Sequence, residues 1–516
     1  MQLRLPVCAM RSKFLPAAVL AISVAAICSG CGGGSSASPP PQSTPPSTPP
    51  SQPSTPQSNV IVQENQKPGD KGWRLSNPTP IGQHNIEGYA SATSINRGES
   101  ISFFVSTAAP SYTIDVYRMG WYNGDGARHM MDTITRTGSQ QPIPAPDSFG
   151  MIECNWNDPY VLKVPNSSDS TDWASGVYLA KLTEVGDSNH DSYIVFVVRD
   201  DSRKTDFLFQ TSSNTYEAYN DWGGESLYST PRAFKVSYNR PYGNDLGSGN
   251  FFRWEFNLLR FLEREGYDVS YSTDVDTHAN ANLLTQHKGV LVAGHDEYWS
   301  KEMFDSLQAA RDAGVNLGFF GADTGYWQVR MEPSPVTSAA NRTIVCYKGD
   351  ATRLDPDAAD PSTAQLTTGA FRDPPVNRPE AALVGVAATL SDPYGVGDLV
   401  IADASSPVFQ GTGLNNGDKL TGLLGHEVDQ TQSSSPSNLT ILTKSPYSDP
   451  KDVNGGGNSE MTEYTAPSGA NVLATGSLQW SWGLDDDNYI SRHALLTNPA
   501  AQQAMRNILA QFGGKH

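Results

Sequence analysis

Acid, base and aromatic side chains are concentrated at residues 294–300, GHDEYWS, directly after the apolar run GVLVA. His295 supplies an imidazole that gains or loses a proton near neutral pH, and Asp296 and Glu297 supply carboxylates that can bind a hard cation. Capping the helix that follows would need only one Asp or Ser. The number of reactive groups therefore predicts that this turn carries chemistry as well as a cap.

Two more polar loops follow runs that read as buried strands. SSNTYEAYN (residues 212–220) follows DFLFQT, and GADTGYW (residues 321–327) follows NLGFF. In a parallel sheet, ligands bind beyond the carboxyl ends of the strands. We therefore expect all three loops to meet at one edge of a sheet and to form a site.

The residue types in these loops favour metal chemistry over a protein nucleophile. No G-x-S-x-G turn stands at a strand end in the sequence, so acyl-enzyme chemistry on serine is disfavoured. A carboxylate and tyrosine phenols can hold a hard metal ion, and such an ion makes hydroxide from water near neutral pH. The pKa of an isolated phenol is ~10, and a nearby multiply charged cation lowers it.

The elements that must position these loops fall into two groups. Residues 60–202 contain short alternating runs, such as ESISFFVSTA and DSYIVFVVRD, between Gly, Pro, Asn and Asp turns. These runs predict an antiparallel β-sandwich. Residues 203–516 alternate strands with helical patterns such as RWEFNLLRFLEREG and KEMFDSLQAARDAG. They predict a doubly wound α/β domain, so the expected fold class is α+β multidomain.

The N-terminal residues have the features of an exported lipoprotein. Basic residues precede the apolar run FLPAAVLAISVAAICSG, which predicts a secretory signal peptide over residues 1–30. Small residues stand directly before Cys31, the expected lipidation site, and residues 31–58 form a Pro/Ser/Gly-rich linker that cannot build a core. We expect an anchored lipoprotein of the bacterial cell envelope, in the periplasm or at the outer membrane.

The composition of the chain limits the class of partner it can bind and the cysteine chemistry it can carry out. The chain has 516 residues, 54 acidic against 36 basic, with a net charge of −18, which excludes a general nucleic-acid binder. Apart from the N-terminal segment, the cysteines are Cys154 and Cys346. They could pair or be buried separately, and no Cys/His pattern of zinc spacing occurs in the sequence.

Several motifs, taken in order, resemble the N,N-dimethylformamidase large (beta) subunit family. They are IDVYRMGWYNGDGAR, SGVYLAKL, NTYEAYNDWGG, GHDEYWS, GADTGYW, LLGHEVD and SLQWSWGLD, and the resemblance spans roughly residues 70–512. It implies a C-terminal domain similar to the class I glutamine amidotransferase fold. It also implies an amidase whose mononuclear iron (Fe³⁺) is held by two tyrosines and a glutamate. The family works with a small partner subunit; a homo-oligomer or such a subunit stays open here.

The resemblance assigns roles to six residues, motif by motif. The implied iron ligands are Tyr178, Tyr216 and Glu297. The implied catalytic residues are His295, Asp323 and Glu427. Asp323 stands where the family has an asparagine, and a carboxylate in place of an amide loses two donors and adds a negative charge. The orientation of the substrate, and the substrate itself, can therefore differ from those of the family.

Tyr178 carries a geometric expectation of its own. It belongs to the predicted sandwich, whereas Tyr216 and Glu297 belong to the α/β domain. A shared ion would lie between the two domains, and its removal would loosen them together. On the residues alone, Tyr178 shares a strand face with Ala180 and Leu182 and fits a core tyrosine.

The main functional prediction is an iron-dependent hydrolase of a small-molecule amide or other non-peptide C–N bond, anchored in the cell envelope. One alternative is a non-catalytic envelope module that binds glycan or peptide through aromatic side chains. Its candidate contacts are Trp121, Trp222, Trp480 and Trp482. The other alternative is a carbohydrate-active enzyme in the same cleft, with Glu297 and Asp323 as paired carboxylates.

Overall fold

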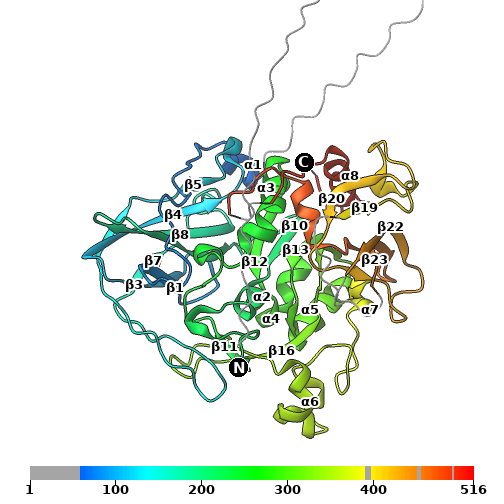
Figure 1. Cartoon of the computed structure of the whole chain (residues 1–516). Coiled ribbons are helices and arrows are strands. Elements are labelled where there is room, and N and C mark those ends of the chain that lie inside the picture. Colours follow the sequence, from blue (N-terminus) through cyan, green and yellow to red (C-terminus); the bar gives the residue numbers. More distant parts are fainter. Residues whose placement is uncertain (1–58, 390–396, 450–454, 491–492, 516) are drawn as a thin grey trace, which may run out of the picture. The chain divides into compact units, whose positions relative to one another are not determined.

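The computed structural model describes residues 59–389, 397–449, 455–490 and 493–515. The predicted signal peptide (1–30), Cys31 and the linker (31–58) lie outside the described residues. The described residues belong to one compact unit, shown in Figure 1. No helix within them is long and apolar enough to cross a membrane.

The first part of the described chain holds two sheets around a shared core. The smaller sheet has the order β1 (Ile86–Ala90), β3 (Ser100–Thr107), β7 (Tyr160–Lys163). The larger has the order β2 (Ser94–Asn96), β9 (Asp191–Arg199), β8 (Gly176–Val185), β4 (Ser111–Met119), β5 (Ala127–His129), with β6 (Ile134–Thr137) also paired to β4. Alternate residues, such as Phe103, Ile114 and Leu182, point into the core between the sheets, as a period of two requires.

A seven-stranded sheet forms the second part. Its order is β12 (Val269–Thr273), β10 (Phe207–Thr211), β13 (Gly289–His295), β15 (Asn316–Ala322), β24 (Asn471–Ala474), β23 (Gly456–Thr465), β22 (Thr440–Ser448). The pairs from β12 to β24 are parallel, and those between β24, β23 and β22 are antiparallel. Every residue of β10 and β13 is buried, which explains their near-continuous apolar runs.

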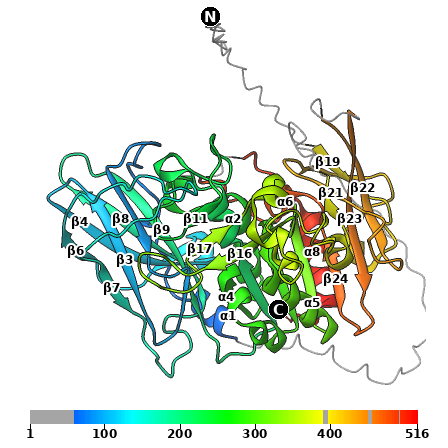
Figure 2. The same cartoon turned by 90° about the horizontal axis from the view of Figure 1, so that it is seen from below.

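The remaining elements are short or lie beside this sheet (Figures 1 and 2). The helices are α1 (Val60–Asn65), α2 (Ser213–Ala218), α3 (Phe256–Arg264), α4 (Asp274–Ala279), α5 (Lys301–Asp312), α6 (Ala351–Leu354), α7 (Ala381–Val384) and α8 (Pro499–Gln511). Smaller sheets pair β11 (Lys235–Ser237), β17 (Thr343–Val345), β16 (Trp327–Glu332) and β14 (Tyr298–Ser300); β18 (Ala387–Ala388) and β21 (Asp429–Gln430); and β19 (Gly397–Val400) and β20 (Lys419–Leu424). The structure is thus mixed α/β, as predicted at that level.

The strand order creates a crevice between β10 and β13. After β10 the chain moves to β12 on one side, and after β13 it moves to β15 on the other. The connections that leave the carboxyl ends of these two neighbours therefore diverge. Such a switch point is where open parallel sheets bind their ligands.

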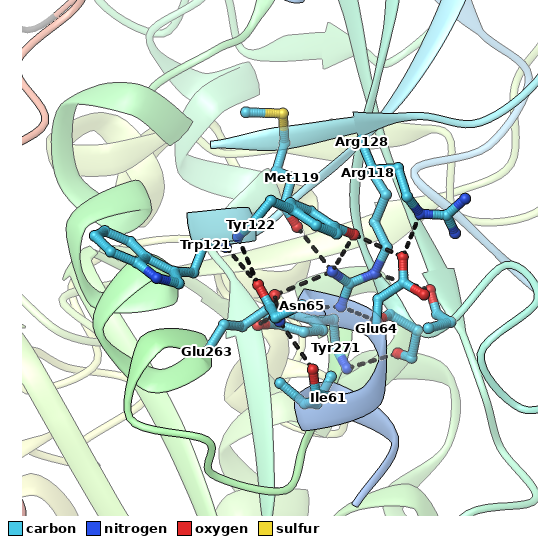
Figure 3. Close-up of polar contacts among 12 residues, drawn as sticks. Ile61, Glu64, Asn65, Arg118, Met119, Trp121, Tyr122, Arg128, Glu263 and Tyr271 are labelled. Carbon is cyan, nitrogen blue, oxygen red and sulfur yellow. Dashed lines mark hydrogen bonds and ion pairs between the residues drawn. The ribbon is translucent and has the colours of Figure 1, made fainter. Parts of the chain in front are cut away.

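A buried ionic network joins the two parts of the unit (Figure 3). Arg118 of β4 is fully buried and pairs with Glu263 of α3, with Nη2 2.7 Å from Oε1 and Nη1 3.0 Å from Oε2. Tyr122 donates to Glu64 of α1 at 2.7 Å, and Tyr271 of β12 donates to Glu263 at 2.8 Å. Because both charges are paired and hydrogen-bonded, this contact holds the first sheets to the large sheet without a metal ion.

Candidate metal centre

The turn GHDEYWS begins at the last residues of β13 and ends at the cap of α5. Ser300 is the N-cap, and its hydroxyl accepts from the backbone N–H of Met303 at 3.1 Å. Gly294 has φ +67°, and a Cβ there would lie 2.2 Å from the Cβ of Trp254. Only glycine fits that position. Because Ser300 does the capping, His295 and Glu297 are available for another role.

Two phenols and one carboxylate converge at the crevice. Tyr219, the C-cap residue of α2 after β10, donates to Oε2 of Glu297 at 2.9 Å. The hydroxyl of Tyr228 lies 2.8 Å from that of Tyr219 and 3.2 Å from each Glu297 oxygen. Tyr298 donates to the hydroxyl of Tyr228 at 2.6 Å. We call Tyr219, Tyr228 and Glu297 the phenol–carboxylate centre.

A second group of acid–base side chains lies against this centre. Nε2 of His295 is 2.6 Å from Oε2 of Glu427 and 3.2 Å from Oε2 of Glu297. Ligand atoms of His295, Glu297 and Asp323 all lie within 4.8 Å of one another. Despite these short distances, His295 Nε2, Glu427 Oε2 and Asp323 Oδ1 are buried without a well-aligned hydrogen-bond partner among the described residues. Close, poorly aligned N and O atoms of this kind suit coordination of a cation.

The local charges keep the phenols protonated in the absence of a cation. Burial, followed by the negative charge of Glu297, raises the pKa of Tyr219 and of Tyr228 well above its ordinary value. Burial opposes protonation of His295, but Glu427 and Glu297 outweigh it and raise the pKa of this imidazole. Ionising a phenol here therefore requires a positive charge at the centre.

Lys348 provides one fixed positive charge nearby. Its ammonium lies 3.3 Å from the ring centroid of Tyr228 and within 5.3 Å of the rings of Tyr298 and Trp327. Burial lowers the pKa of Lys348 to about 8, although Glu297 opposes the shift. The ammonium over its ring favours the anionic form of Tyr228.

Asp323 lies in a carboxyl-rich environment. Its backbone N–H donates to Oδ1 of Asp429 at 2.8 Å, and its φ of +53° is unusual for a residue other than glycine. Burial, then the charges of Glu427, Asp429 and Glu297, raises the pKa of Asp323 well above its ordinary value. These surroundings favour the protonated form of the Asp323 carboxyl, and in that form it can donate a hydrogen bond, as the amide of an asparagine would.

An open cleft of about 510 Å³ leads to these groups. Tyr219, His295 and Glu427 face it from one side, and Trp254 and Arg253 line another part. Its volume falls within the roughly 300–1,000 Å³ that small-molecule sites occupy. The reactive groups are thus accessible to a small molecule from outside the sheet.

The structure places two members of the expected ligand set, Tyr178 and Tyr216, apart from Glu297. Tyr178 lies in the core of the first two sheets, stacked on Trp173 at 5.5 Å, and its hydroxyl donates to the carbonyl of Ala174 at 2.6 Å. Tyr216 is 3% exposed and lies beside Glu255, whose carboxylate adds to burial in raising the pKa of the phenol. The structure does not bring Tyr178 or Tyr216 to Glu297.

The expected position of the ion changes accordingly. The centre is built from Tyr219, Tyr228 and Glu297, all within the second part of the chain. An ion there does not link the first sheets to the large sheet. The Arg118–Glu263 pair is among the contacts that do, together with a hydrophobic cluster that includes Val177 and Phe256.

His295, Asp323 and Glu427 were all predicted, and the structure brings them together. Tyr228, Tyr298 and Lys348 were not predicted. Tyr219 stands in the same NTYEAYN motif as Tyr216, so the motif pointed to the loop but the wrong tyrosine was chosen. Tyr228 lies in a turn region without periodicity, and nothing local in its sequence marks it.

The two remaining cysteines are free and buried. Cys154 packs near Trp156 and Trp222, whereas Cys346 packs in a separate cluster with Tyr298 and Val329. Of the two expected possibilities, a disulfide pair or separate burial, the structure shows separate burial.

Comparison with known proteins agrees with the sequence resemblance. Residues 113–493 match the family model described as N,N-dimethylformamidase beta subunit-like, C-terminal. A search of curated proteins finds no match to the chain. The matched region covers most of the chain and includes all residues of the phenol–carboxylate centre, and the chain belongs to the N,N-dimethylformamidase beta subunit-like family.

Proposed function

We propose that the protein is a metal-dependent hydrolase of an amide or other non-peptide C–N bond, with iron as its metal. The observation that carries this proposal is the convergence of Tyr219, Tyr228 and Glu297, whose oxygens lie 2.8–3.2 Å apart. Two phenols and a carboxylate are the donor types that the family resemblance implies. Membership in a dimethylformamidase-like family supports an amidohydrolase.

The residues present fit a hard, multiply charged cation. Tyr219, Tyr228 and Glu297 would hold it, since oxygen donors suit such ions and these phenols, whose pKa values are raised, need a positive charge to ionise. The Tyr298 hydroxyl and the Lys348 ammonium would stabilise Tyr228 in its anionic form. When bound, the metal would act as a Lewis acid, which polarises a carbonyl and lowers the pKa of bound water.

His295 and Glu427 would move the protons of the reaction. Hydrolysis of an amide removes one proton from water and delivers one to the departing nitrogen. Nε2 of His295 and Oε2 of Glu427, 2.6 Å apart, can hold and exchange a proton between them. Both residues line the cleft and therefore face an incoming substrate.

Asp323 would orient the substrate. Its Oδ1 is buried without a partner among the described residues and lies within reach of His295 and Glu297. A protonated carboxyl can donate to the oxygen of an amide, which compensates in part for the family's asparagine.

The finer fold and the cellular location are part of the same proposal. The parallel order of β12, β10, β13, β15 and β24 supports an amidotransferase- or flavodoxin-like domain from residue 203, preceded by a β-sandwich over residues 60–202. The signal-like residues 1–30 and Cys31 support a lipid-anchored envelope protein. The family resemblance implies a small partner subunit, and the mass of the assembly in solution tests for that subunit or for a second copy.

The two alternative functions have weaker support. Trp480, Trp482 and Trp222 are each at most 5% exposed, and two arginines, Arg260 and Arg264, cover the ring of Trp121. These rings do not form an open stacking platform for a glycan.

Paired carboxylates for glycoside hydrolysis remain the second candidate. Oxygens of Glu297 and Asp323 lie within 4.8 Å, and retaining glycosidases place their carboxyls about 5–5.5 Å apart. Glu297, however, accepts from two tyrosines and contacts His295, which is typical of a ligand rather than of a free nucleophile.

The test combines metal analysis with activity. The signal-free chain should purify with about one iron per protein and hydrolyse members of a panel of small amides, and Glu297→Gln should lose both the metal and at least ~100-fold of kcat/KM. Polysaccharides in the same panel test the carbohydrate alternative. Stoichiometric iron that survives Glu297→Gln, or amide turnover by a chain without metal, would contradict the proposal.

A further inference from the structure

A second cavity of about 410 Å³ lies where the first sheets meet the loops after α2. One wall comes from β1 and β9, through Ile86, Gly88 and Ser192. Most of the rest of the lining comes from the segments Thr79–His84, Asp221–Gly224 and Pro241–Gly243, and from Leu246 and Gly247. We call this space the side cavity. It is separate from the phenol–carboxylate centre, and none of the six residues to which the family resemblance assigns a role lines it.

The side cavity adjoins the cleft of the metal centre. Ile81, Asp221 and Gly243 line both spaces. Asp221 follows Tyr219 by two residues in the same loop. A molecule that placed one end beside Tyr219 and His295 could therefore extend its other end past Ile81 into the side cavity.

The wall is mostly apolar, and its Glu87 carboxylate is paired. Ile86, Ile143, Trp222 and Leu246 supply apolar surface. Glu87, the most buried acid of the wall, accepts from the indole N–H of Trp222 at 2.7 Å and contacts Nδ1 of His84 at 2.9 Å. Burial raises the pKa of this carboxyl despite both contacts. An anionic ligand would meet Glu87 and Asp221, so a neutral apolar group fits best.

Two details distinguish this space from a gap in packing. Ile81, at the junction of the two spaces, is 90% exposed. A ligand that covered this apolar side chain would gain the free energy of removing its surface from water. Ser192 is 6% exposed, and its hydroxyl lacks a hydrogen-bond partner among the described residues. Ser192 is a small residue of a wall whose polar members also include Glu87 and His84.

We infer that the side cavity binds the apolar substituent of the substrate, so that the preferred substrate is an amide with a chain of several carbons or an aryl group rather than a formamide. This inference rests on the proposed amide hydrolysis for the position of the amide group, and on the geometry of the two adjoining spaces for its substituent. A formyl or methyl group would leave about 410 Å³ of apolar space in water. A longer group fills it, and each buried methylene raises kcat/KM roughly fourfold.

The test is a homologous series of formamide, acetamide, butyramide and hexanamide, with N-butylformamide to distinguish the acyl side from the amine side. In the native sequence, kcat/KM should rise from acetamide to hexanamide or from formamide to N-butylformamide. Ser192→Phe, which fills the cavity, should reduce the ratio of long to short substrate at least ~10-fold. Ile81→Ser changes an exposed residue, avoids a folding defect, and should lower the same ratio.

Two control variants accompany these. Ser192→Ala removes the hydroxyl without filling the space and should keep most of the preference, whereas Ser188→Phe adds the same ring on the exposed β8–β9 turn and should keep all of it. A preference that does not rise with chain length, or one that Ser192→Phe leaves intact, overturns the inference while amide hydrolysis stands.

Calorimetric titration with hexanamide keeps the two proposals separable if no amide is turned over. The native chain should bind hexanamide more tightly than acetamide, and Ser192→Phe should not bind hexanamide. That result supports binding of the apolar substituent in the side cavity without any turnover. Failure of the native chain to bind hexanamide overturns it.

Discussion

Tyr216 and Tyr219 stand three residues apart at the end of one short helix, yet they contact different carboxyl groups. Tyr216 points to Glu255, and Tyr219 donates to Glu297. Residues three apart on a helix differ in direction by about 60°, which is enough to separate a core tyrosine from a ligand. The difference is visible only once the position of α2 relative to β13 is known.

The tyrosine assignments predict a pattern of metal loss. Tyr219→Phe and Tyr228→Phe should each remove a donor, lower the bound iron to well below one per chain, and abolish any phenolate-to-iron absorption in the visible range. Tyr216→Phe and Tyr178→Phe are matched controls that should keep the metal, because neither hydroxyl reaches Glu297. Elemental analysis and absorption spectra measure both outcomes; metal loss in the controls alone would reverse the assignment.

A second residue-level prediction concerns Asp323. If its carboxyl donates a hydrogen bond to the substrate, Asp323→Asn should retain kcat/KM within about threefold, since the amide is also a donor. Asp323→Ala, which leaves no donor, should lose ~10-fold or more, mostly in kcat. Equal losses in both variants would show that the negative charge matters and not the donor.

At the scale of elements, local patterns predicted the strands and helices around the site and their parallel sheet, but not the smaller sheets beside it. The β13–turn–α5 unit was predicted because its apolar run, its polar turn and the Ser300 cap are contiguous. The segment after β10 was predicted as a polar loop and is the helix α2 followed by a turn. The small sheet that joins β14 to β16 depends on partners far apart in sequence, so no local pattern reveals it.

The same distinction explains the site. His295 and Glu297 lie within one motif, and the motif was found. Tyr228 and Lys348 reach the site from separate turns, and their positions depend on tertiary packing alone. The motifs therefore located His295 and Glu297, which lie together in the structure, whereas the contacts of Tyr228 and Lys348 with this group are visible only in the structure.

The Arg118–Glu263 pair predicts a large effect on stability. Arg118→Met leaves the Glu263 carboxylate buried without its cation, and should lower the free energy of unfolding by ~3–5 kcal/mol. The double variant Arg118→Met/Glu263→Leu removes both charges and should recover part of that loss. Denaturant titration measures the difference; a single variant as stable as the native chain would show that the pair contributes nothing.

A buried histidine gives a pH prediction at the same scale. Burial lowers the pKa of His287 to about 4, and its Nδ1 contacts the hydroxyl of Thr205 at 2.8 Å. The unfolded chain binds the proton near pH ~6.5, so stability contributed by neutral His287 is lost as pH falls from about 6.5 to 4, by up to ~3 kcal/mol.

His287→Gln removes this titration. Its free energy of unfolding should fall less steeply between pH 6.5 and 4 than that of the native chain, in parallel urea titrations at each pH. Equal slopes would indicate that His287 is protonated in the folded protein.

At the scale of the whole molecule, the proposed metal site and the contacts between the two parts of the unit involve different residues. Removing the ion with a chelator should lower Tm, because a ligand at 100 times its Kd stabilises the folded state by about 2.7 kcal/mol. The chain should nevertheless unfold in one transition, since the contact between the first sheets and the large sheet does not depend on the ion. Two resolved transitions in metal-depleted protein, seen by calorimetry, would restore the ion as the link.

The pair of Arg118 and Glu263 has a consequence for how the protein is made. The two residues are separated by 145 positions in the sequence. During synthesis the arginine emerges long before its partner, and the first strands must wait with an unmatched charge until α3 has followed them. A fragment ending before residue 263 would retain that unpaired charge, so the chain is unsuitable for expression as two separate halves. Folding is therefore completed late in synthesis, after α3 has been made.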